Sequence, residues 1–160
     1  MTDVHGFDPL LSAQRQIGVP PNYLHGCWGE RNPLNIPGPF YGAATDDCAD
    51  GPLFAPETLS YDHEGRGYVW RQPIDDAEVQ RILEGMYSDP YEGFAWDGNE
   101  HWTPALVREW WADRHERADL IGEPVHYPEA EMAYDLRRYL YFLDAGRSPE
   151  AGVLLPELWS

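Results

Sequence analysis

Apolar side chains recur at helical spacing in three stretches of the second half of the chain. Over residues 75–86 the apolar positions lie three to four apart, and acidic residues fill the first turn, where the helix dipole favours anions. Two further apolar stripes run over residues 104–121 and 128–146, and each opens at a proline and stops at or beside a glycine. The pattern therefore predicts three main helices.

The first half of the chain has a different pattern, with prolines and glycines every few residues from 19 to 56. Such spacing excludes a long helix and interrupts any central strand. A short helix is predicted before it, at 8–17, because an acidic N-cap is followed by proline and then by a closing glycine. After it, residues 59–62 and 67–73 have strand composition, and the polar turn between them predicts a hairpin.

These elements predict an α+β fold in a single domain over residues 1–160. Residues 1–73 form a loop-rich part with a small antiparallel sheet, and residues 74–146 form a helical part. The apolar tail, 147–160, is expected to dock on the body or on a partner. A chain of this length can bury about two-thirds of its unfolded surface, so it needs no disulfide or metal to fold.

The net charge is -17, from 28 acidic residues against 11 basic ones, and every basic residue is arginine. A body this negative repels nucleic acid and anionic lipid, and it attracts cationic proteins. The absence of lysine excludes Schiff-base and P-loop chemistry. Arginine used without lysine, beside many alanines, glycines and prolines, indicates a GC-rich bacterial genome.

The acidity is concentrated between residues 74 and 103, where eight acids and one arginine give a net charge of -7. Aromatic residues are interleaved with these acids, and such a surface suits a cationic protein. We therefore expect a small acidic binding protein, of the inhibitor, immunity or accessory type, that masks a basic protein partner. The expected partner-binding residues are Asp89, Tyr91, Glu92, Phe94, Trp96, Asp97 and Glu100.

A small enzyme or ligand-binding protein is the alternative, with a pocket for a small molecule between the 23–48 loop and the 104–121 helix. Arg114 falls within an apolar stripe, where it either pairs with a carboxylate over the tryptophans or binds an anionic substrate group. Whether the chain is an enzyme stays open, because it contains no catalytic signature motif. The candidate catalytic residues are His25, Cys27, Glu30, Arg31, His101 and Arg114.

Two groups of residues offer metal ligands, although no cofactor is predicted. Asp97, Glu100 and His101 can form a carboxylate and imidazole cluster, but a turn leading into the next helix is the favoured interpretation. A structural zinc is the less favoured alternative for a second group, because the usual paired spacing of zinc ligands is missing. That second group consists of His25, Cys27, Cys48 and His101.

The chain contains no apolar run that approaches the length of a membrane span. Residues 1–18 lack a basic start followed by an apolar run, so we expect no signal peptide. We therefore expect a cytoplasmic protein without a membrane partner. In that compartment the two cysteines, Cys27 and Cys48, are expected to be thiols.

Overall fold

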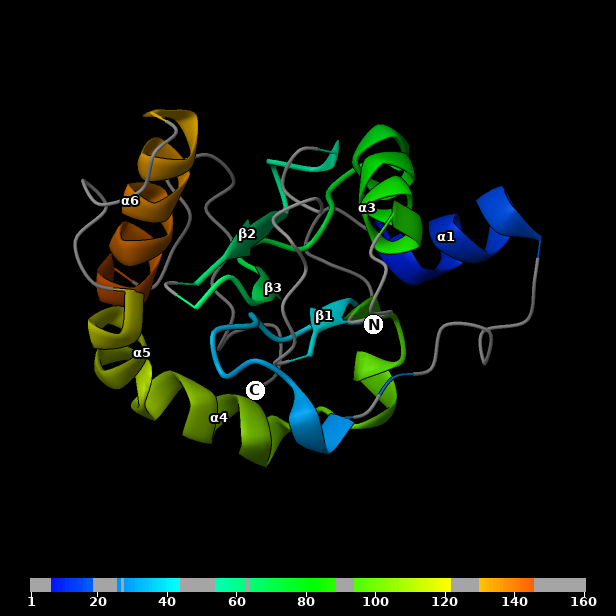
Figure 1. Ribbon diagram of the computed structural model, residues 1–160. Coiled ribbons are helices and arrows are strands. Elements are labelled where there is room, and N and C mark those ends of the chain that lie inside the picture. The colour runs from blue at the N-terminus through cyan, green and yellow to red at the C-terminus, as the bar shows by residue number, and fades with distance from the viewer. Residues whose placement is uncertain are drawn as a thin grey trace. The chain divides into compact units, whose positions relative to one another are not determined.

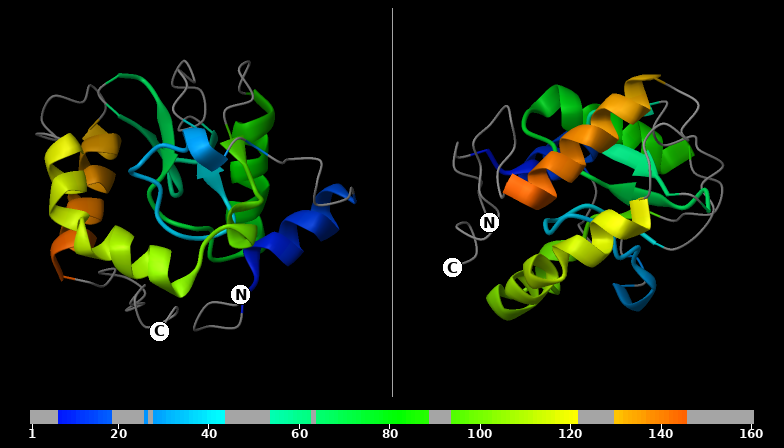
Figure 2. Two further views of the ribbon diagram at one scale, coloured as in Figure 1. Left: turned by 90° about the horizontal axis from the view of Figure 1, so that it is seen from below. Right: turned by 90° about the vertical axis from the view of Figure 1, so that its left-hand side faces the viewer.

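The structure is a computed structural model, shown in Figures 1 and 2. Its described residues are 7–18, 26, 28–43, 54–62, 64–88, 94–121 and 130–145. The chain divides into two compact units, Met1–His101 and Trp102–Ser160. Both sheets belong to the first unit, and the described part of the second is helical. The predicted α+β class is confirmed, whereas the expected single domain stays a prediction.

The first helix, α1, spans Pro9–Ile17 and has the capping that its sequence predicts. The side chain of Asp8 accepts hydrogen bonds from the backbone N–H groups of Leu10 and Leu11. Gly18 ends the helix in the left-handed region, at φ +64°, which glycine adopts without strain. These local signals are sufficient to define both ends of the helix.

Helix α3 (Asp76–Ser88) packs against α1 within the first unit (Figure 1). Ser12 donates a hydrogen bond of 2.5 Å to the Asp76 carboxylate, and the Gln16 amide donates to the Asp76 carbonyl at 2.9 Å. An acid in the first turn of α3 therefore also fastens α1. The apolar face that the spacing predicts is buried, and its side chains are Val79, Ile82, Leu83 and Met86.

The predicted hairpin is confirmed as β2 (Leu59–Tyr61) and β3 (Gly67–Val69), which pair antiparallel. Its turn is held by Asp62, whose Oδ1 accepts hydrogen bonds from the N–H groups of Glu64 and Arg66 at 2.9 and 3.0 Å. A short acidic side chain that caps backbone amides in this way is a common means of closing a turn.

A second two-stranded sheet pairs β1 (Tyr41–Gly42) with β4 (Phe94–Ala95), again antiparallel. Sequence patterning does not predict this sheet, because two residues are too few to show an alternation. Its register places Tyr41 opposite Ala95. Two segments far apart in the sequence are thereby brought together at the point where the candidate site begins.

The buried side chain of Asn35 joins the two sheets. Its Oδ1 accepts hydrogen bonds from the N–H groups of Gly42, in β1, and of Val69, in β3, each at 2.8 Å. Its Nδ2 donates to the carbonyls of Asn32 at 2.7 Å and of Gly42 at 2.6 Å. This amide, only 2% exposed, is thus fully used in satisfying backbone groups.

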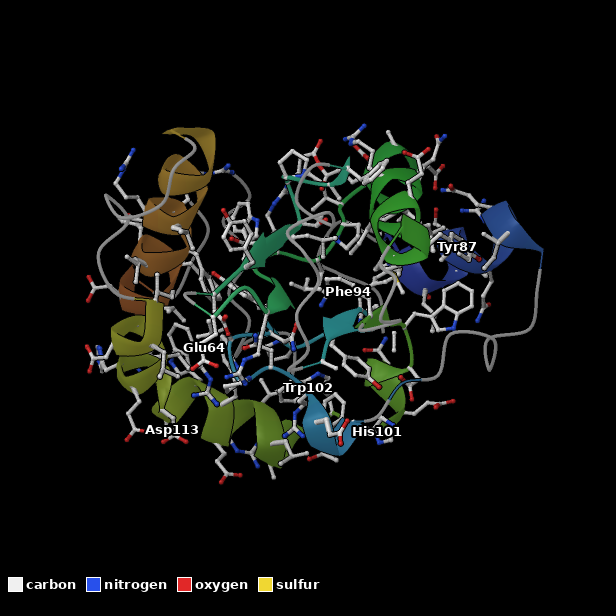
Figure 3. The ribbon with its side chains drawn as sticks, in the orientation of Figure 1. Glu64, Tyr87, Phe94, His101, Trp102 and Asp113 are labelled. Carbon is white, nitrogen blue, oxygen red and sulfur yellow. The ribbon has the colours of Figure 1, made fainter. Side chains whose placement is uncertain are left out.

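In the second unit, the prediction of one helix over 104–121 is wrong, because α4 (Pro104–Ala112) and α5 (Arg114–Ile121) are separate. The break lies at Asp113, labelled in Figure 3. In a continuous helix, backbone N–H groups would bond to the carbonyls of Trp110 and Trp111. Here the guanidinium groups of Arg117 and Arg114 donate to those carbonyls, at 2.9 and 3.0 Å.

Helix α6 (Ala130–Ala145) lies within the range that its apolar stripe predicts, and α5 contacts it (Figure 2). Its buried side chains include Leu136, Tyr139, Phe142 and Leu143. Burial raises the pKa of the Tyr139 hydroxyl, and nearby Arg117 partly opposes this shift.

Among the described helices, none is both long enough and apolar enough to cross a membrane. The tail at 147–160 lies outside the described residues.

Candidate functional site

The candidate site begins at the turn that follows β4, where Figure 3 labels Phe94 and then His101. The turn contains the short 3-10 helix η3 (Gly98–Glu100), and the N–H of Gly98 donates to the Pro39 carbonyl at 2.8 Å. A Cβ atom at Gly98 would lie 2.2 Å from the Gly38 carbonyl oxygen. The turn therefore requires glycine in order to pack against residues 38 and 39.

Asp97, just before that turn, is the hydrogen-bonded centre of the site. Its side chain is only 5% exposed. Oδ1 accepts a hydrogen bond of 2.6 Å from the Tyr41 hydroxyl, and the Gly26 N–H lies 3.4 Å away. Oδ2 lies 3.2 Å from Nε2 of His101. A buried carboxylate supported by two side chains is held in one orientation, as catalytic and ligand-binding sites require.

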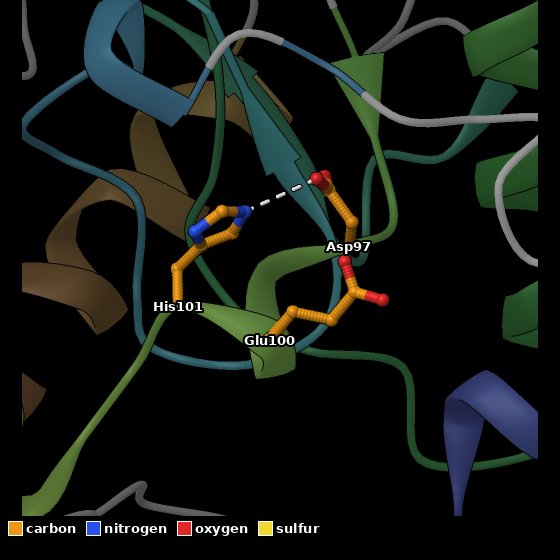
Figure 4. A group of neighbouring side chains, drawn as sticks. All are labelled: Asp97, Glu100 and His101. Atoms are coloured by element: carbon orange, nitrogen blue, oxygen red, sulfur yellow. Dashed lines mark hydrogen bonds and ion pairs between the residues drawn. The ribbon is translucent and has the colours of Figure 1, made fainter.

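His101 is the accessible member of this pair, with 35% of its side chain exposed. Figure 4 shows Nε2 turned toward Asp97 and Nδ1 on the opposite edge of the ring. An ionised carboxylate only accepts hydrogen bonds, so a neutral imidazole in this contact carries its hydrogen on Nε2. The lone pair of Nδ1 is then available, because Nδ1 makes no hydrogen bond to the described residues.

Aromatic side chains hold the imidazole ring in place. Trp28, at the start of the 3-10 helix η2 (Trp28–Glu30), stacks on His101 with ring centroids 4.8 Å apart and planes 10° apart. The same indole meets the Tyr41 ring edge to face at 5.2 Å. A bridge between Arg31 and Ala43, next to β1, connects this segment to the sheet.

Arg31 extends the stack, because its guanidinium lies 4.1 Å from the centroid of the Trp28 ring. Its Nη1 also donates a hydrogen bond of 3.0 Å to the Trp28 carbonyl. Partial burial lowers the pKa of the Arg31 guanidinium, and Tyr41 acts in the opposite direction. An arginine remains protonated at neutral pH in such a setting, so a positive charge lies against the indole ring that stacks on His101.

The turn also offers ligands for a divalent cation. One ligand atom each from Asp97, Glu100 and His101 can be chosen so that all lie within 4.8 Å of one another (Figure 4). Two carboxylates and an imidazole suit manganese, iron or zinc. In such a site a ring nitrogen of His101 would bind the metal, and the hydrogen bond from Tyr41 would orient the Asp97 carboxylate.

The structure brings together only some of the residues that the sequence singles out. Asp97, Glu100 and His101 share one turn, and Arg31 lies against Trp28, which stacks on His101, whereas Glu30 is exposed on η2. Phe94, Trp96 and Asp97 are buried, and their role in partner binding stays a prediction. The candidates outside the described residues are His25, Cys27, Cys48, Asp89, Tyr91 and Glu92.

Arg114, the remaining candidate, lies in the second unit. It stacks on Trp111, with 4.6 Å from its guanidinium carbon to the ring centroid, and donates to the Trp111 carbonyl. The expected carboxylate partner is not found among the described residues. The predicted pocket between the 23–48 loop and the 104–121 helix stays a prediction.

Two residues of the site, Tyr41 and Trp28, are not among the sequence candidates. Tyr41 reaches Asp97 only through the pairing of β1 with β4, which local patterning does not indicate. Trp28 lies within the loop that contains most of the candidates, and its neighbour Arg31 is one of them. The four-residue spacing of Asp97 and His101 is the one signal in the sequence that points to the pair.

Comparison with known proteins gives no match, whether to a protein-family model, to a curated protein or to a solved structure. The geometry of the site therefore carries the functional conclusion.

Proposed function

We propose that the protein is a small enzyme in which His101 acts as a general base. One observation carries this proposal: buried Asp97 joins Tyr41 to Nε2 of a partly exposed imidazole, which leaves Nδ1 on the opposite edge. A carboxylate that holds a histidine in one tautomer, and stabilises the imidazolium, is the arrangement that general-base catalysis uses.

Hydrolysis by direct attack of water is the reaction class that fits these contacts. In the described residues His101 has Asp97 as its side-chain hydrogen-bond partner, with no hydroxyl or thiol in that role. Nδ1 would take a proton from water as the water oxygen bonds to the substrate. The imidazolium, paired with Asp97, would then return that proton to the leaving group. The Trp28 stack fixes the ring while the charge changes.

Screening of a substrate panel tests this proposal. The panel contains chromogenic esters, amides, phosphoesters and glycosides, and turnover by the wild type is compared with His101→Gln and Asp97→Asn. We expect one substrate class to be hydrolysed, with a rate about 100-fold lower in His101→Gln. His115→Gln is the control, because His115 is an exposed histidine of α5. Equal rates in the wild type and in His101→Gln would contradict the proposal.

A second candidate function is the masking of a basic protein partner. It is supported by the net charge of -17 and by exposed Glu84 and Tyr87, one turn apart on α3, with Tyr87 labelled in Figure 3. Capture of a basic protein at low salt and its release at high salt would support it. Loss of capture in an Asp89→Asn, Glu92→Gln variant, but not in His101→Gln, would separate the two functions.

A further inference from the structure

The junction of α4 and α5 places two guanidinium groups on two neighbouring indole rings. The Arg114 guanidinium lies 4.6 Å from the Trp111 ring centroid, and the Arg117 guanidinium lies 4.9 Å from that of Trp110. The two rings stack with centroids 6.5 Å apart and planes 28° apart. Two guanidinium groups thus pack on neighbouring indole rings in a chain whose net charge is -17.

The hydrogen bonds of Arg114 leave its Nε donor unused. Arg114 and Arg117 each give one Nη1 to a carbonyl at the end of α4. Nε of Arg114 is buried and makes no hydrogen bond, and neither does the buried Nε1 of Trp110, which is 4% exposed. A buried donor without an acceptor is unfavourable, because it has lost its hydrogen bonds to water. Nη1 of Arg114 therefore has a structural role, because it caps the end of α4. Its Nε has no such role.

The local charges do not supply an acceptor either. Arg114 forms no ion pair with any described residue, although the chain holds 28 acids against 11 bases. Its acidic neighbours along the helices, Asp113 and Glu116, are exposed to solvent. The Nε and Nη2 edge of a guanidinium is a planar fork that matches two oxygens of a carboxylate or phosphate.

We infer that Arg114 anchors an oxyanion-binding site in the second unit, with the ring of Trp111 packed against its guanidinium. The ligand is a small molecule that carries a carboxylate or a phosphate group. An incoming oxyanion gives the Nε edge of Arg114 its missing acceptor. Because Nε is covered, the guanidinium turns on the Trp111 face as the oxyanion binds.

Two-dimensional ¹H–¹⁵N NMR tests this site, since it detects the Nε–H of Arg114 and the indole N–H of Trp110. The probes are sodium phosphate and sodium acetate, each titrated at constant ionic strength with sodium chloride as the reference. We expect saturable shifts of both signals with at least one probe, and the probe that binds more tightly identifies the ligand class. Shifts that do not saturate, or that chloride reproduces, would overturn the inference.

Matched variants locate the site. Arg114→Gln should weaken binding by about tenfold or more, because a charge-assisted hydrogen bond is lost. Arg108→Gln should leave binding unchanged, because Arg108 is an exposed arginine of α4 and its removal makes the same change in net charge. Equal weakening in both variants would show a general charge effect and overturn the site.

Arg114→Lys keeps the charge and the aliphatic stem but removes the planar fork, so it tests the fork even if Arg114→Gln does not fold. We expect Arg114→Lys to bind the probe several-fold more weakly than the wild type, as monitored by the Trp110 indole signal. Binding by Arg114→Lys as tight as that of the wild type would contradict recognition through the Nε edge.

Discussion

The hydroxyl of Tyr41 donates a hydrogen bond of 2.6 Å to Oδ1 of Asp97, across 56 positions of the sequence. This contact occupies one oxygen of the carboxylate and leaves the other for His101. The orientation of the imidazole therefore depends on the pairing of β1 with β4, which brings Tyr41 to the turn. This hydrogen bond therefore couples the fold to the candidate site.

Removal of that hydroxyl tests the coupling. Tyr41→Phe leaves Oδ1 of buried Asp97 without its short hydrogen bond, so the free energy of unfolding should fall by about 1–2 kcal/mol. Urea denaturation measures this change. Tyr141→Phe is the matched control, because Tyr141 is 48% exposed on α6, and its expected change is within about 0.5 kcal/mol. An equal effect in both variants would contradict the coupling.

Gly98 provides an independent test of the turn that carries His101. An added Cβ collides with the Gly38 carbonyl, so Gly98→Ala should displace η3 and lower the free energy of unfolding by about 1–3 kcal/mol. Urea denaturation and the NMR signals of the His101 ring report the two effects. Gly29→Ala, where a Cβ meets no atom within 4 Å, should leave both unchanged. Unaltered His101 signals in Gly98→Ala would contradict this account of the turn.

Asn35 is predicted to be the most sensitive buried polar residue of the first unit. Asn35→Ala leaves the N–H groups of Gly42 and Val69 without an acceptor, so the free energy of unfolding should fall by about 2–4 kcal/mol. Asn99→Ala is the comparison, because Oδ1 of Asn99 has no hydrogen-bond partner among the described residues. Chemical denaturation that ranks Asn99→Ala as the more damaging change would refute this role of Asn35.

Glu78 predicts a pH dependence of stability. Burial raises the pKa of its carboxyl group, Arg71 at 3.0 Å opposes the shift, and Asp75 adds to it. The folded protein therefore holds this proton more tightly than the unfolded chain does. The resulting stabilisation is complete below the unfolded pKa of about 4.3 and is lost as pH rises through the folded pKa.

Glu78→Gln removes this titration, so its difference from the wild type isolates the effect. The free energy of unfolding of the wild type, relative to that of Glu78→Gln, should fall as pH rises from about 4 to about 7. Urea denaturation of both proteins across this range measures the difference. If this difference stays constant, or if the wild type becomes more stable relative to Glu78→Gln as pH rises, the pKa of Glu78 is not raised.

Elements with local signals are the ones that the sequence predicts. Asp8 and Gly18 cap α1, and the hairpin has its strand composition and turn, so both were predictable. The sheet of β1 and β4 was not, because it pairs Tyr41 with Ala95 across a long separation. At the break beside Asp113, arginine side chains donate to two carbonyls of α4, and helical periodicity does not show such contacts.

The features of the candidate site likewise fall into those that the sequence predicts and those that depend on tertiary structure. The spacing of Asp97 and His101 within one turn is visible in the sequence, whereas the burial of Asp97 and the contribution of Tyr41 depend on tertiary structure. The interleaved acids and rings suggested an exposed surface, but Phe94 and Trp96 are core side chains. Composition alone does not distinguish an interface ring from a buried one.

The tautomer of His101 tests the central claim most directly. Long-range ¹H–¹⁵N NMR spectra of the protein, recorded at a pH where the ring is neutral, distinguish a protonated ring nitrogen from an unprotonated one. We predict the proton on Nε2, facing Asp97, with Nδ1 unprotonated and able to accept a proton from a ligand. In Asp97→Asn this preference should weaken. A wild-type ring with its proton on Nδ1 and a bare Nε2 would contradict the account.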